Sequence, residues 1–344
     1  HCQAELTRTG TLTGAQALHA DWMRSSAPLP LDDPDVALVA SRLDLVAEAS
    51  DDIDAAFRFL ARTAPAEAAR LALDLRDYWM TRSRQHAAIE LLTTVDVAEL
   101  PADLGTGLLG EIAYLGWATG RLEEGEAAGR RALALAADAG LELPTWAATW
   151  LAIRLAFDNR ASEARTLAER VEATVRSGHG DLTRCFAPLS IVFAVSGDLA
   201  HGLAIVDESI AAARERGVIA LTSAIANRLL MAPDDPSGQL LAEALGLART
   251  IGRTEVVAHA VLADGHRRLQ HGDAPGYLSA AAEFCDLMID SQPTSVLSTL
   301  QVATEPASQV SPRAAAMLMG AVEGLAEAYQ HQGSPLDSRR RSRV

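Results

Sequence analysis

The chain has 344 residues, of which 49% are hydrophobic and only 4% aromatic, and its formal net charge is −15. So acidic a chain is a poor ligand for nucleic acid, and we expect no direct nucleic-acid binding. The sequence contains no lysine, which excludes a phosphate-loop lysine, a Schiff-base lysine and a lysine general base within it. No apolar run is long enough to span a membrane, no secretory signal is visible, and Cys2, Cys185 and Cys285 follow no disulfide spacing. A cytoplasmic protein without membrane contact is expected.

Residues 1–64 are predicted to form a helical extension that precedes the regular part of the chain. In order, its predicted elements are a helix at 15–25, a rigid proline-rich loop at 27–34, and helices at 35–49 and 53–62. Asp51 and Asp52 fit the start of the last helix, where carboxylates cap free amides and complement the helix dipole.

From residue 65 onward, a short turn recurs about every 38 residues, which is typical of stacked helix pairs. The turns begin at Arg82, Gly120, Asn159, Gly197 and Gly272, with one degenerate unit before the last. Five positions after each of the first four stands a small residue: Ala87, Gly125, Ala164 and Gly202. A second series of glycines closes the second helix of a pair: Gly140, Gly178, Gly217 and Gly252. We infer that the turn residue ends the first helix and that the small residue lets the second pack closely.

The sequence therefore predicts an all-α, right-handed superhelical solenoid of about six helix pairs over residues 65–290. The predicted pairs are 65–80 with 84–93, 105–118 with 122–139, 144–157 with 161–176, 181–195 with 199–216, 219–231 with 236–251, and 255–270 with 274–289. A C-terminal helical cap over 291–332 is expected to begin with a Ser/Thr/Pro/Gln-rich break around a short helix, followed by a last helix at 312–330. The tail 333–344 is expected to be flexible and basic.

The turn chemistry favours tetratricopeptide-like pairs over HEAT-like repeats, whose period is about 40–47 residues. Four segments carry a further resemblance: 42–57, 71–79, 120–140 and 314–323. They resemble the tetratricopeptide-rich region of large actinobacterial transcriptional regulators, which also carry a STAND-type ATPase module and often a LuxR-type DNA-binding domain. The resemblance implies a non-catalytic sensor module that binds an effector or a protein. This sequence contains neither the ATPase nor a helix-turn-helix, so regulation by ATP or DNA is not expected of this segment itself.

Candidate catalytic and metal-binding residues all have a simpler interpretation. The spacing of His259, His266 and His271 does not give the i, i+4 pair that zinc sites on helices use. Arg184 could lower the pKa of the adjacent Cys185 thiol, but a buried structural cysteine is the alternative. No serine stands in a G-x-S-x-G motif, and the arginine-rich run at 339–343 fits a solvated linker. We expect no enzyme activity, no cofactor and no metal.

The few aromatic residues give a candidate binding surface. Tyr114 and Trp117 lie six and three residues before the turn at Gly120, and Arg76, Trp79 and His266 hold the same positions before their own turns. Equivalent positions of a helical repeat face the same side, which for the first helices is the concave side. The candidate groove residues are Arg76, Trp79, Tyr114, Trp117, Trp146, Phe157, Arg184 and His266. The alternative is that the tryptophans fill the core between repeats.

Two functions fit these observations. The first is a sensor module of a cytoplasmic transcriptional regulator that binds a protein or peptide partner, or a small effector, in the groove. The second is a stand-alone scaffold that mediates protein–protein interactions. Self-association into a homo-oligomer is compatible with both.

Overall fold

The computed structural model describes residues 11–26, 30–232 and 238–328, and in these ranges it has 17 α-helices, one short 3₁₀ helix and no strand. The N-terminal helices are α2 (Leu12–Ser26), α3 (Val36–Glu48) and α4 (Ser50–Thr63). The following helices pack as pairs: α5 (Pro65–Thr81) with α6 (Gln85–Leu92), α7 (Ala102–Ala118) with α8 (Leu122–Asp138), α9 (Thr145–Phe157) with α10 (Ala161–Arg176), α11 (Leu182–Val195) with α12 (Leu199–Arg216), α13 (Val218–Met231) with α14 (Gln239–Ile251), α15 (Thr254–Gln270) with α16 (Ala274–Met288), and α17 (Pro293–Val310) with α18 (Pro312–Ala328). The predicted all-α solenoid is confirmed.

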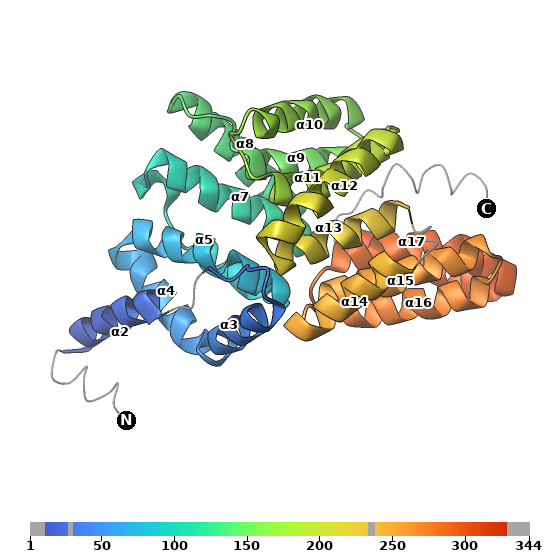
Figure 1. Ribbon diagram of the computed structural model, residues 1–344, viewed down its shortest axis with the longest axis horizontal. Coiled ribbons are helices and arrows are strands. Elements are labelled where there is room, and N and C mark those ends of the chain that lie inside the picture. The colour runs from blue at the N-terminus through green and yellow to red at the C-terminus, as the bar shows by residue number, and fades with distance from the viewer. Residues whose placement is uncertain (1–10, 27–29, 233–237, 329–344) are drawn as a thin grey trace.

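The pairs form two layers along the solenoid (Figure 1). Each first helix contacts the next first helix, so α5, α7, α9, α11, α13 and α15 form a continuous inner row. The strongly apolar sequences of α7, α9 and α11 suit this position, since these helices are covered on more than one side. The second helices lie outside this row and present charged faces.

The repeat turns adopt the left-handed backbone expected from their residues. Gly120, Asn159, Gly197 and Gly272 have φ values of 78°, 60°, 93° and 82°. In the first pair the left-handed residue is Ser83, with φ of 53°, rather than the predicted Arg82. Gly125 lies where α7 and α8 touch, because a Cβ there would be 3.0 Å from the carbonyl oxygen of Ala113.

The C-terminal part contains a seventh helix pair, so the predicted short helix between 291 and 312 is wrong. Helix α17 has 18 residues and packs against both α16 and α18. Pro306 removes one backbone hydrogen bond, but the buried side chains of Val296, Leu297 and Ala303 hold the helix in place. The predicted end of the last helix at 330 and the tail 333–344 lie outside the described residues.

The N-terminal segment closes the curve of the solenoid against the fifth pair, where α3 packs on α14 (Figure 1). The Asp32 carboxylate accepts hydrogen bonds from the amides of Ile219, at 2.8 Å, and Ala220, at 3.2 Å, and so caps α13. Gly217 ends α12, as expected from the sequence, and its backbone there is extended, with φ of 177°. Its lack of a side chain serves another purpose, since a Cβ there would lie 2.2 Å from the Asp32 Cγ. Residues nearly 200 positions apart are thereby joined.

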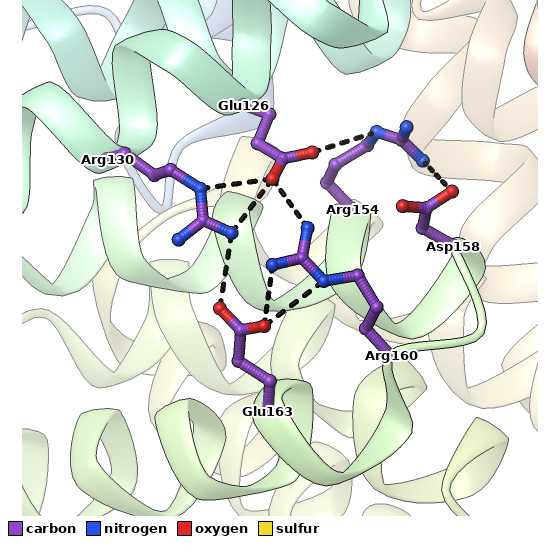
Figure 2. A network of polar contacts seen from close by, with 6 residues as sticks. All are labelled: Glu126, Arg130, Arg154, Asp158, Arg160 and Glu163. Carbon is purple, nitrogen blue, oxygen red and sulfur yellow. Dashed lines mark hydrogen bonds and ion pairs between the residues drawn. The ribbon is translucent and has the colours of Figure 1, made fainter.

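Outside the inner row, ion pairs connect neighbouring repeats (Figure 2). Glu126 of α8 contacts Arg130 on its own helix, Arg160 at the start of α10 and Arg154 of α9, with N···O distances of 2.9, 2.7 and 3.8 Å. Burial alone would raise the pKa of Glu126, but the hydrogen bonds from Arg130 and Arg160 outweigh it and lower this pKa. This network fixes the second pair against the third and lies outside the cavity described next.

Candidate functional site

The inner row of first helices encloses a cavity of about 460 Å³. Every one of the six first helices from α5 to α15 contributes to its lining, and the loop at Pro30 and Asp32 closes one side. The cavity crosses the helices obliquely, from Arg76 and Met80 in the C-terminal half of α5 to Glu255 and His259 in the N-terminal half of α15. Its volume falls within the range of about 300–1,000 Å³ that is usual for small-ligand sites.

Four of the eight candidate groove residues line this cavity: Arg76, Tyr114, Trp146 and Arg184. The other four do not. Trp79 is buried in the core, Trp117 stacks on Phe157 with ring centroids 4.9 Å apart, and His266 stacks on Tyr277. The oblique path of the cavity explains why His266 lies outside it, since the histidine of α15 that lines the cavity is His259, two turns earlier.

Three aromatic rings form one wall of the cavity. Tyr114 lies 4.8 Å from Trp150 and 5.9 Å from Trp146, and the two indoles meet edge to face at 5.4 Å. The Arg184 guanidinium lies 5.7 Å from the centroid of the Trp146 ring. Trp150 was absent from the predicted groove. It lies nine residues before its turn, and positions six and nine residues before a turn share a helix face.

Two arginines of the cavity differ in their pairing. Arg184 is paired with Asp77 at 2.5 Å, and although burial lowers its pKa, the nearby charges of Asp77, Glu111 and Asp181 outweigh burial and raise it. Arg76 forms no ion pair within the described part of the chain. Burial and repulsion by Arg184 both lower the pKa of Arg76, so its positive charge is only partly compensated.

One carboxylate of the cavity, that of Glu111, also lacks full compensation. Glu111 is 3% exposed, and burial raises its pKa despite the nearby charges of Arg184 and Arg76. Its Oε1 is buried without a hydrogen-bond partner among the described residues. The Oε2 of Glu255 also has no hydrogen bond, but it is ion-paired with Arg253 at 3.6 Å. The hydroxyl of Tyr114, which senses the charges of both glutamates, is also buried and unpartnered. Buried polar groups in folded proteins are normally hydrogen-bonded, so these atoms are unusual.

Arg253 and His259 complete the charged lining on the far side. Arg253 is 2% exposed and donates to the carbonyl of Ile219 at 2.7 Å and to Thr222 Oγ1 at 2.9 Å, which ties α15 to α13. Burial lowers the pKa of His259, so its imidazole stays neutral near pH 7. Sequence reasoning missed Glu111, although a glutamate between Gly110 and Ile112 in an apolar helix was a usable signal.

The other candidate groups have structural roles. Cys185 is buried, and burial raises the pKa of its thiol more than the nearby Arg184 lowers it, so the thiol is not activated. Over residues 11–26, 30–232 and 238–328, no group of His, Cys, Asp and Glu is arranged to hold a metal ion. No helix in the same ranges is long and apolar enough to cross a membrane. Cys2 and the arginine-rich run at 339–343 lie outside the described residues.

Comparisons with known proteins support the fold. No protein-family model matches the chain, and no curated protein matches it. Among solved structures, the chain is similar to the Rap protein in its crystal structure in complex with competence and sporulation factor. The TM-score is 0.57 and the sequence identity 11%, with 86% of this chain and 82% of that chain covered. The chain has a tetratricopeptide-type repeat fold.

Proposed function

We propose that this chain is a non-catalytic sensing module that binds a peptide or small effector in the cavity of its inner row. The observation that carries this proposal is a 460 Å³ cavity with buried, unpartnered polar groups, lined by six of the seven first helices. A ligand that touches six consecutive repeats can bias the curvature of the whole solenoid. The Rap protein, whose fold is similar, was solved in complex with competence and sporulation factor, which supports a binding role for such a fold.

The resemblance of the repeats to those of actinobacterial regulators supports a place in a cytoplasmic transcriptional regulator. In that setting, ligand binding would act on an attached ATPase or DNA-binding domain. The coding sequence around this segment tests this setting. A neighbouring ATPase with a lysine-containing phosphate loop is expected, whereas a reading frame that encodes only helix pairs would contradict it.

The alternative function is a protein scaffold, and one observation favours it. Leu18 and Trp22, one turn apart on α2, are 73% and 60% exposed and form an apolar face at the N-terminal end of the array. Such faces often mark contacts with another protein or domain.

A display library of random short peptides, selected on the purified protein, tests the sensing function. Selected peptides should bind the wild type and fail to bind Trp150→Ala, because Trp150 lines the cavity. The matched control is Trp117→Ala, which removes a half-buried tryptophan that stacks on Phe157 outside the cavity and should leave binding within about twofold. Selected peptides that bind Trp150→Ala as well as the wild type would place binding elsewhere and contradict the proposal.

A further inference from the structure

The charges that line the cavity are nearly balanced. Four arginines and five carboxylates contribute to the lining: Arg76, Arg184, Arg216, Arg253, Asp32, Asp77, Glu111, Asp181 and Glu255. Most of these charged groups form ion pairs with one another or hydrogen bonds with groups of α13. Arg184 pairs with Asp77, and Arg216 pairs with Asp181 at 3.2 Å. Asp32 caps α13, while Arg253 is held by two oxygens of that helix.

The groups left over carry both signs of charge. Arg76 has no ion pair within the described residues, and Glu111 has a buried oxygen without a hydrogen-bond partner. Glu255 is not among them, because its Oε2 is ion-paired with Arg253 at 3.6 Å. Glu111 is 3% exposed and so is almost wholly removed from water. Burying a charge is costly unless it is paired, so each of these groups favours a ligand group of the opposite sign.

The aromatic wall lies beside the unpaired Glu111 oxygen. Tyr114 is 5% exposed, senses the charges of Glu111 and Glu255, and contacts both Trp146 and Trp150. An ammonium group has three N–H donors and is also attracted to the faces of aromatic rings. The Glu111 oxygen and the Tyr114 hydroxyl are acceptors that match these donors.

We propose that the cavity binds a small zwitterion, an amino acid or short peptide with free termini, with its carboxylate at Arg76 and its ammonium at Glu111. This rests on the proposed function, in which the cavity is the ligand site. The aromatic wall then contacts the apolar part of the ligand. Arg76 suits a carboxylate because a guanidinium can donate two parallel hydrogen bonds to it. A net-neutral ligand also leaves the near balance of the lining charges undisturbed.

Equilibrium dialysis with mass-spectrometric detection tests the proposal, with four probe pools. The pools are tripeptides with free termini, the same tripeptides N-acetylated, the same tripeptides C-amidated, and the free amino acids. We expect the wild type to retain free-terminus tripeptides or free amino acids. Either cap should lower tripeptide retention by about tenfold or more, since each removes one charge-assisted contact. The amino-acid pool decides which of the two sources supplies the zwitterion.

Two conservative variants make the test specific to each end of the ligand. Arg76→Gln should remove the preference for a free carboxylate over an amide and keep the preference for a free ammonium. Glu111→Gln should do the opposite, and such crossed effects are not produced by a general loss of folding. Because either variant could disturb the cavity, circular dichroism of each is compared with the wild type.

The remaining outcomes distinguish failure of the zwitterion inference from failure of the sensing function. If free-terminus, N-acetylated and C-amidated tripeptides are retained equally, and all three are lost in Trp150→Ala, the zwitterion inference fails and the sensing function stands. If Trp150→Ala retains the free-terminus pool as well as the wild type does, the sensing function itself fails at this cavity. Retention of none of the pools overturns the zwitterion inference, and the display experiment then decides the sensing function separately.

Discussion

Replacing Gly125 by leucine should separate α7 from α8 and destabilise the array. A Cβ at this position would lie 3.0 Å from the Ala113 carbonyl oxygen and 3.2 Å from the Gly116 Cα. Both are backbone atoms, which cannot rotate away as a flexible side chain can. Forcing extra carbons into such a contact typically costs about 1–3 kcal/mol.

The matched control is Gly246→Leu on α14, where an added Cβ meets nothing within 4 Å. Both substitutions replace a helical glycine, so the gain of about 1 kcal/mol in helix propensity is similar in both. The difference in unfolding free energy between the two variants therefore isolates the overpacking cost of about 1–3 kcal/mol. Urea unfolding followed by circular dichroism measures it, and amide exchange in α7 and α8 localises it. Equal stability of the two variants would refute the close backbone contact between α7 and α8.

Three further outcomes are expected from the titrating groups. Burial raises the pKa of Glu111 above its ordinary value of 4.5. The cost of burying its negative charge therefore destabilises the fold as the pH rises above 4.5. Glu111→Gln should therefore melt at a higher temperature than the wild type at pH 7.5 and at the same temperature near pH 4, and a variant less stable at pH 7.5 would contradict this. Burial would raise the pKa of Glu126, but its hydrogen bonds with Arg130 and Arg160 lower this pKa below its ordinary value of 4.5. These ion pairs therefore stabilise the fold above pH 4.5, and their contribution is lost as the pH falls. Glu126→Gln should cost roughly 1 kcal/mol at neutral pH and nothing in acid, whereas the exposed Glu123→Gln should change little at any pH. Burial raises the pKa of the Cys285 thiol from 9.0 to about 11, so its alkylation rate by iodoacetamide should keep rising up to about pH 11, and a plateau near pH 9 would show an exposed thiol.

The repeat architecture was predictable because its signals are local. The turns at Gly120, Asn159, Gly197 and Gly272 need a left-handed residue, and glycine and asparagine adopt that backbone at little cost. The seventh pair was missed since α17 carries proline and polar residues, and packing against α16 and α18 outweighs those local preferences.

The candidate site was only half predictable because its shape depends on how the repeats tilt. The register relative to the turn identified Arg76 and Tyr114, but the cavity drifts along successive helices, so His266 and Trp117 fall outside it. The closure of the array was not predictable from local pattern. The Asp32 cap on α13 joins residues far apart in the chain, and the sequence shows it only as an aspartate in a loop and a glycine at 217.

The central claim is that the cavity of the inner row is where this protein binds its ligand. A crystal structure of the protein with the most strongly retained free-terminus probe tests it most directly. The account predicts the ligand inside the cavity, with its carboxylate at Arg76, its ammonium near Glu111 and its apolar part against Trp150. A ligand bound on the outer second helices, or beside Trp117 and Phe157, with the cavity unchanged, would contradict it.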